Sequence, residues 1–219
     1  MIAKDIISKN ITPVKIGDAA QKALDLMAKQ MTKHLPVLEN GKLVGVISEE
    51  TILRNDLDVK IVDLPMNYSG KYVNHKDHLF EILKHMSEHN MSIMPVVKED
   101  MEYFGTITQN EIIKNFARAE SITEHGSIII LEVIKRDYSL AEIARIVENE
   151  GFSIIGTFIT TSENPEIIEV ALKINSTNIS AIIASFERYQ YIVKASFEEN
   201  DYSDKIKDRF DSLMSYLNV

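Results

Sequence analysis

The sequence contains no cysteine among its 219 residues, which excludes disulfide bonds and thiolate chemistry. It also lacks a run of about 18 apolar residues, which a membrane-spanning helix needs. Its first residues do not form the long apolar stretch of a secretory signal. The formal net charge of −9 argues against nucleic acid as a partner, because phosphate backbones attract basic surfaces. We therefore expect a cytoplasmic protein that neither inserts into a membrane nor binds nucleic acid.

The acidic charge is distributed unevenly along a chain that has enough apolar residues to form buried cores. Apolar side chains make up 45% of the sequence. Residues 1–120 have a net charge of −2, and residues 121–219 have a net charge of −7. This asymmetry favours two domains rather than one.

The first half of the sequence carries one pattern twice. Pro36 and Pro95 are 59 positions apart. Other matched pairs share this offset or, after one inserted residue, an offset of 60: Asp18 and Asp77, Met27 and Met86, Gly45 and Gly105, and Ser48 and Thr108. Each copy predicts the order strand, helix, strand, strand, helix. A duplicated unit buries apolar faces between its copies, and a pseudo-twofold pair leaves clefts where small molecules bind.

Local signals place the elements of the first copy. Asp18 is predicted to cap a helix, with Gln21 as its capping-box partner. Asn40 and Gly41 predict a tight hairpin turn, since both residues accept a positive φ. The corresponding turn of the second copy, residues 99–102, is longer and lacks the Asn-Gly pair.

The repeated segment resembles a known family. Residues 34–48 read HLPVLENGKLVGVIS, a helix is predicted after them, and the pattern recurs once. This arrangement resembles a tandem pair of cystathionine-β-synthase (CBS) domains, with repeat one at residues 1–64 and repeat two at residues 65–120. The resemblance implies a non-enzymatic regulatory module that forms a homodimer. It also implies that AMP, ADP, ATP or S-adenosylmethionine binds in the cleft between the copies.

Two hydroxyl residues mark the candidate ligand site. Ser48 and Thr108 each stand where a strand is predicted to end and a helix to begin, a position that favours phosphate. The family usually carries an acid three residues later, which binds ribose; this residue is Glu111 in copy two but Thr51 in copy one. We therefore expect one competent site around Thr108 and Glu111 and one degraded site around Ser48. Apolar residues at the strand starts are expected to lie against the adenine, namely Val14, Leu35, Val73 and Met94. The alternative is that both hydroxyls are plain helix caps.

Histidines recur along the predicted long helix of the second copy. His78, His85 and His89 share one face, with Glu81 and Glu88 beside them. A solvent-facing helix surface is our first interpretation, and a dimer contact is an alternative. His85 and His89 also have the i, i+4 spacing of metal ligands, but no third ligand is evident from the sequence. We expect no metal.

Residues 127–219 follow a different plan. Their pattern predicts the order β-α-β-β-α-β, which is the ferredoxin-like fold, followed by an amphipathic helix over Asp201–Leu217. The segments VIKRDYSL and ENEGFSIIGTFI resemble an ACT domain over residues 127–198. ACT domains bind amino acids through an Asp-x-Pro-Gly-x-Leu turn, whereas this sequence has Asp137-Tyr138-Ser139-Leu140. A structural or dimerising role is therefore our first interpretation, and amino-acid sensing is the alternative.

The whole sequence therefore predicts an α+β protein, a CBS pair followed by an ACT-like domain. This combination resembles the acetoin-utilization protein B group of bacterial proteins. Our leading hypothesis is a sensor whose ligand-dependent change is transmitted to a regulated protein that the sequence does not name. The competing hypothesis is a structural adaptor with vestigial clefts. An enzyme is disfavoured, because the sequence has no P-loop, catalytic triad or anchored carboxylate pair.

Overall fold

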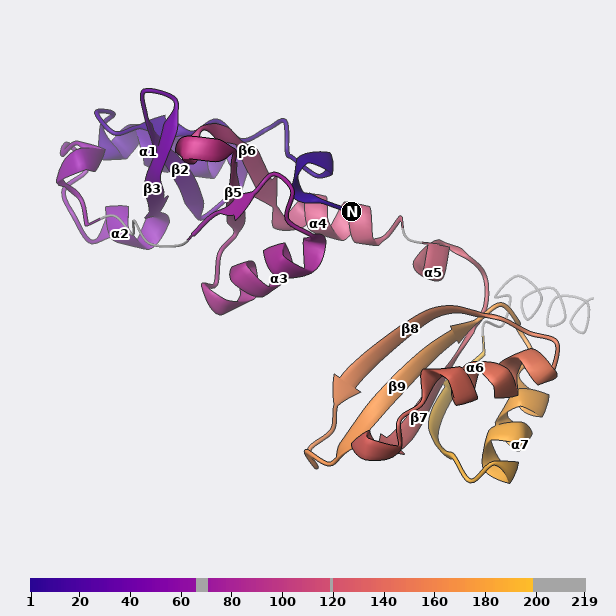
Figure 1. Ribbon diagram of the computed structural model, residues 1–219. Coiled ribbons are helices and arrows are strands. Elements are labelled where there is room, and N and C mark those ends of the chain that lie inside the picture. The colour runs from indigo at the N-terminus through magenta and orange to yellow at the C-terminus, as the bar shows by residue number, and fades with distance from the viewer. Residues whose placement is uncertain (66–70, 119, 199–219) are drawn as a thin grey trace, which may run out of the picture. The chain divides into compact units, whose positions relative to one another are not determined.

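The computed structural model describes residues 1–65, 71–118 and 120–198 (Figure 1). The chain divides into two compact units, Met1–Phe116 and Ala117–Val219. Both units combine helices and strands, which confirms the predicted α+β class. The predicted helix over Asp201–Leu217 lies outside the described residues. Within the described ranges, no helix combines the length and the apolar character that crossing a bilayer would require.

The first unit contains the same set of elements twice. Copy one has β1 (Val14–Lys15), α1 (Ala20–Gln30), β2 (His34–Glu39), β3 (Lys42–Ser48) and α2 (Glu49–Leu53). Copy two has β4 (Val73–Asn74), α3 (Leu79–Glu88), β5 (Ile93–Val97), β6 (Tyr103–Thr108) and α4 (Gln109–Phe116). Short 3-10 helices are η1 (Ala3–Asp5), η2 (Ile61–Asp63) and η3 (Glu99–Met101).

The two three-stranded sheets have matching topology and register. Their orders are β1-β2-β3 and β4-β5-β6, with a parallel first pair and an antiparallel second pair. Val14 pairs with Val37, and Val73 pairs with Val96 at the equivalent place. The duplication predicted from the sequence is therefore a duplication of the fold.

Turn residues behave as predicted at the first hairpin. Asn40 and Gly41 have φ values of 50° and 80°, and the flanking residues Glu39 and Lys42 pair across the turn. A two-residue turn of this kind matches the twist of the strands that it joins.

The predicted cap of α1 is wrong. Ala19 is the N-cap and makes no side-chain cap bond. The Asp18 carboxylate instead accepts hydrogen bonds from the Lys15 backbone N–H at 2.9 Å and from Lys22 Nζ at 2.8 Å. Asp18 therefore stabilises the turn between β1 and α1. Its carboxylate binds the N–H of Lys15, three residues earlier in the chain, instead of an N–H of the helix.

Each copy is completed by a segment that precedes the other copy. In η1, the Ala3 N–H donates to the Asp77 carbonyl at 2.9 Å, and in η2 the Ile61 N–H donates to the Asp18 carbonyl at 2.9 Å. Ala3 is buried in the core of copy two, and Ile61 is buried in the core of copy one. Copy two is therefore completed by η1, which precedes copy one in the sequence, whereas η2 directly follows copy one and packs into the copy-one core.

The second unit has the ferredoxin-like fold. It contains α5 (Glu120–Thr123), β7 (Ser127–Ile134), η4 (Lys135–Asp137), α6 (Leu140–Asn149), β8 (Ile154–Thr161), β9 (Ile167–Ile174), α7 (Ser180–Arg188) and β10 (Ile192–Phe197). The strands form one antiparallel sheet in the order β10-β7-β9-β8. This order confirms the predicted β-α-β-β-α-β plan.

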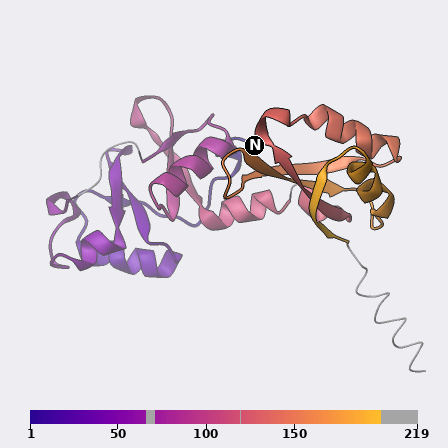
Figure 2. The same cartoon turned by 90° about the horizontal axis from the view of Figure 1, so that it is seen from below.

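Both long helices of the second unit cover one face of its sheet (Figure 2). Burial alternates along β7 and β9, as expected for strands with one covered face. Side chains from these strands share a single core with residues of α6 and α7, including the fully buried Phe186. Ser139 caps α6, and Gly151, with a φ of 82°, follows its last residues.

Candidate functional site

Two cavities lie between the copies of the first unit. The larger has a volume of about 850 Å³ and contains Ser48. The smaller has a volume of about 150 Å³ and contains Thr108 and Glu111. We call them the Ser48 crevice and the Thr108 crevice. Small-molecule sites have volumes of roughly 300–1,000 Å³, so the Ser48 crevice has room for a ligand as it stands.

The two crevices are related by the internal repeat. Equivalent positions line them in pairs, Ser48 with Thr108, Glu50 with Asn110, Arg54 with Lys114, His89 with Gln30, and Asn90 with Met31. Ser92 lines both. The copies therefore form one type of crevice twice, and the differences in side chains decide what each can hold.

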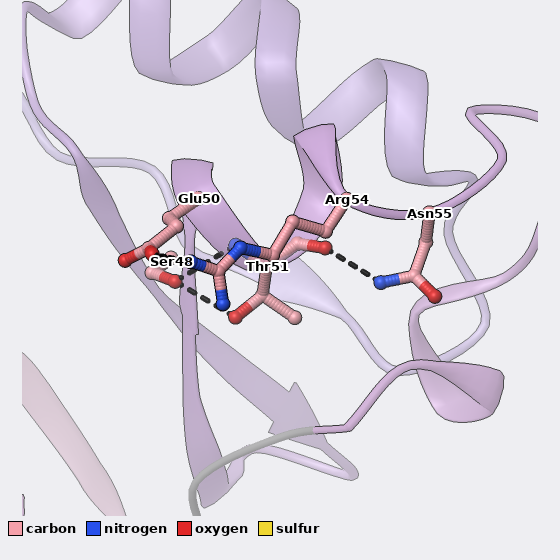
Figure 3. A network of polar contacts seen from close by, with 5 residues as sticks. All are labelled: Ser48, Glu50, Thr51, Arg54 and Asn55. Carbon is pink, nitrogen blue, oxygen red and sulfur yellow. Dashed lines mark hydrogen bonds and ion pairs between the residues drawn. The ribbon is translucent and has the colours of Figure 1, made fainter.

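In the Ser48 crevice, the hydroxyl lies at the start of α2 (Figure 3). Ser48 Oγ accepts a hydrogen bond from the Thr51 backbone N–H at 3.1 Å and lies 2.8 Å from Thr51 Oγ1. Arg54 pairs with Glu50 one turn apart, and Asn55 Nδ2 donates to the Thr51 carbonyl at 2.8 Å. The Thr51 side chain thus bonds to the cap in the position where the family usually has an acid.

In the Thr108 crevice, the Thr108 hydroxyl likewise caps a helix, α4. Thr108 Oγ1 accepts a hydrogen bond from the Glu111 backbone N–H at 3.2 Å. The Glu111 carboxylate lies 3.3 Å from Lys114 Nζ, and Asn115 Nδ2 donates to the Glu111 carbonyl at 2.8 Å. Both predicted hydroxyls are therefore helix caps. They also line cavities, and the Thr108 hydroxyl, as an acceptor at its cap, keeps a proton to donate to a ligand.

Three hydrogen-bonded side chains, Thr32 and His34 of copy one and Ser92 of copy two, join the two copies between the crevices. Ser92 Oγ lies 2.8 Å from Thr32 Oγ1 and 3.0 Å from His34 Nδ1. The backbone N–H of Ser92 donates to His34 Nδ1 at 3.3 Å. Burial lowers the pKa of His34, and the positive charges of Lys71 and Lys33 lower it further. Neutral imidazole is also what the bond from the Ser92 N–H requires, since Nδ1 must accept.

The Ser48 crevice has three cationic side chains on its wall, Lys33, Arg54 and Lys71, together with the carboxylates of Glu49 and Glu50. Arg54 is paired with Glu50. Sequence reasoning missed these side chains. The contributing side chains come from separate segments of both copies, and only the fold brings them together.

The four residues expected to lie against adenine are buried in this structure. Leu35 and Val14 are buried in copy one, and Val73 and Met94 are buried in copy two. None of the four is among the described residues that line either crevice. Val14 instead lines a third cavity of about 770 Å³ beside the first hairpin. These strand starts carry the first buried side chains of each sheet, so their apolar surface is already covered.

Comparison with known proteins identifies the first unit. The family model described as CBS domain matches residues 3–58 and residues 61–118. The chain belongs to the CBS domain family. The two copies and the paired crevices are therefore those of a CBS domain pair.

Similar proteins agree with the fold of this CBS pair. The solved structure of a CBS domain pair/ACT domain protein from Thermotoga maritima is 22% identical with a TM-score of 0.50, covering 54% of this chain and 98% of that chain. At that identity the likeness shows the fold alone.

Curated relatives match over the same half of the chain. A CBS domain-containing protein of Methanocaldococcus jannaschii is 24% identical over 118 residues, which are 53% of this chain and 95% of the relative. A homoserine O-acetyltransferase of Methanosarcina acetivorans is 25% identical over 126 residues, which are 54% of this chain but only 22% of the relative. The chain thus spans less than a quarter of that enzyme.

Proposed function

We propose that this protein is a non-enzymatic regulatory sensor that binds an adenine nucleotide or S-adenosylmethionine between its CBS copies. The proposal rests on the paired crevices, each with a hydroxyl at the start of a helix. A helix start offers unpaired N–H groups and a partial positive charge to an anion. Ligand binding that favours one arrangement of the copies would shift the population of that arrangement.

The Ser48 crevice is our choice for the phosphate-bearing ligand. It has the larger volume, about 850 Å³, and Lys33 and Lys71 supply positive charge along its wall, whereas Arg54 is paired with Glu50. The Thr108 crevice has the one carboxylate suited to ribose, Glu111, but its volume of about 150 Å³ is below that of ordinary ligand sites. We therefore revise the expectation that the Thr108 crevice is the competent one.

Calorimetric titration with AMP, ADP, ATP and S-adenosylmethionine tests both statements. We expect at least one of the three nucleotides to bind. In Lys33→Gln and Lys71→Gln its affinity should fall about tenfold, because each change removes a charge-assisted contact. Lys42→Gln is the matched control, since Lys42 is an exposed lysine outside the crevice. If Glu111→Gln abolishes binding while the two lysine variants do not weaken it, the nucleotide occupies the Thr108 crevice and our assignment is wrong.

A structural adaptor is the second candidate. It is favoured by the hydrogen bonds of Ser48 and Thr108, which already cap their helices and so explain both residues without a ligand. A ligand that binds only the folded protein must raise the melting temperature. If none of the four compounds does so at millimolar concentration, the adaptor reading replaces the sensor.

We also propose that the second unit is an ACT-like domain and that the chain forms a homodimer. Among residues 120–198, helices cover one face of the ferredoxin-like sheet of the second unit, and we assign the opposite face to assembly. The turn at Asp137 to Leu140 lacks the glycine that lets a backbone approach an amino acid, so we favour assembly over amino-acid sensing. Membership of the acetoin-utilization protein B group, a cytoplasmic location and a separate regulated protein belong to the same proposal. Sedimentation equilibrium would test the dimer.

A further inference from the structure

Three side chains at the end of α3 bring metal-ligand atoms together. His85, Glu88 and His89 each offer one ligand atom, and these atoms lie within 4.8 Å of one another. The two imidazole rings are stacked, with centroids 6.2 Å apart and planes 17° apart. Residues at i, i+3 and i+4 share one face of a helix, which explains why the three side chains meet.

We propose that His85, Glu88 and His89 bind one divalent transition-metal ion, with Zn²⁺ as the best match. Two imidazoles and a carboxylate are a ligand set that zinc accepts, and three protein ligands leave a fourth position for water or another molecule. The order His85-Met86-Ser87-Glu88-His89 is an H-x-x-E-H sequence, whose histidines can hold zinc from adjoining turns of a helix. The sequence alone offered the histidine pair without a third ligand, and the structure supplies Glu88. This revises our expectation that no metal binds.

The position on the helix favours a cation. Glu88 is the last residue of α3 and His89 is its C-cap. The end of a helix carries a partial negative charge from its unpaired carbonyl groups. A divalent ion at this point is therefore stabilised by the backbone as well as by its three ligands.

The environment of His85 points the same way. Its Nδ1 atom is buried and has no hydrogen-bond partner among the residues that the structure describes. A buried polar atom without a partner is costly, and coordination at Nδ1 would give that atom the partner that the described residues do not provide. In a zinc site with bonds of about 2.1 Å, ligand atoms are roughly 3.4 Å apart. Exposed Glu88 and His89 can close that gap by small side-chain rotations.

The metal site adjoins the Ser48 crevice without depending on its ligand. His89 belongs to the cluster and also lines the crevice. The test uses Zn²⁺ alone, so its outcome is independent of whether a nucleotide binds.

Calorimetric titration of the full chain with ZnCl₂, without an affinity tag and after chelator treatment, tests the inference. We expect saturable binding of one Zn²⁺ per chain and a higher melting temperature in its presence. Glu88→Gln and His89→Ala should each weaken binding at least tenfold. Glu81→Gln is the matched control, because Glu81 is an exposed acid on the same helix outside the cluster, and it should bind as the wild type does.

Circular dichroism melting without zinc shows whether each variant is folded, which we expect because Glu88 and His89 are exposed. Absence of saturable binding in the wild type would overturn the proposal. So would a His89→Ala or Glu88→Gln variant that keeps wild-type affinity, since the first would place the ion elsewhere and the second would remove the third ligand.

Discussion

His34, which contacts Ser92 of the other copy, should make the stability of the protein depend on pH. Burial, followed by the charges of Lys71 and Lys33, holds its pKa below the ordinary value of 6.5. The unfolded chain, with an ordinary histidine, therefore binds a proton more readily than the folded chain. Stability is at its full value above about pH 6.5 and falls as the pH drops below it toward the lowered pKa. Protonation would also put a proton on Nδ1, where Ser92 N–H now donates.

We expect the free energy of unfolding to be smaller at pH 5.5 than at pH 7.5, and His34→Asn to reduce that difference. The Asn side-chain oxygen occupies roughly the place of Nδ1 and accepts the same bond without titrating. Urea unfolding of both proteins at the two pH values measures the effect. Equal pH dependence in wild type and variant would mean that His34 does not control the loss.

A second residue-scale prediction concerns Met31, which ends α1. Its φ of 52° lies in the left-handed region, and its side chain is 90% exposed. At the equivalent place in copy two the chain has Asn90, with a φ of 49°. Asn tolerates this conformation better than Met.

Met31→Asn should therefore stabilise the protein by about 0.5–1 kcal/mol, and Asn90→Met should destabilise it by a similar amount. Urea unfolding of this reciprocal pair measures both changes. A stabilising effect of Asn90→Met would contradict the backbone explanation, because that change creates the strain that the first removes.

At the scale of elements, η1 and η2 complete the cores of the CBS pair. Just after η1, Ile6 is 2% exposed in the core of copy two, and Ile61 in η2 is 0% exposed in the core of copy one. Ile6→Ala and Ile61→Ala should each lower the free energy of unfolding by about 2–5 kcal/mol. Val62→Ala, at a 49% exposed neighbour, is the control and should have an effect below about 0.5 kcal/mol. Chemical denaturation gives the values, and a small effect at Ile6 would mean that η1 is dispensable.

Elements whose signals are local were predictable from the sequence. Apolar spacing gave the helices, and Asn40-Gly41 gave the hairpin. The role of Asp18 was not predictable. Whether its carboxylate accepts from the N–H of Lys15 or from an N–H of the helix depends on backbone geometry, which residue spacing does not specify. The packing of η1 against copy two also escaped prediction, since hydrogen bonds between distant segments leave no periodic pattern.

In the candidate site too, residues with a local sequence signal were predictable, and residues that only the fold brings together were not. Ser48 and Thr108 were placed correctly at the starts of helices, because a strand followed by a hydroxyl and a helix is a local pattern. Lys33 and Lys71 were missed, because they reach the Ser48 crevice from different copies. The four residues expected to face adenine lie in the cores and line neither crevice, because apolar strand starts look the same in sequence whether they line a cleft or a core.

At the scale of the molecule, the two units have separate cores and only the first contains the crevices. The residues that line them fall between Ser8 and Lys114, within the unit Met1–Phe116. A fragment of residues 1–118 should therefore fold and bind the nucleotide with the affinity of the full chain. The second unit should affect what the binding event controls rather than the binding itself.

Circular dichroism establishes that the fragment is folded, and calorimetry compares its affinity with that of the full chain. Lys71→Gln in the fragment is the control and should weaken binding as it does in the full chain, because Lys71 lines the same crevice in both. A folded fragment with reduced affinity would show that residues 119–219 contribute to the site. That result would assign the site to both units rather than to the CBS pair alone. A loss of affinity in a folded fragment could not come from a damaged shared core, because the hydrophobic clusters of the two units are separate.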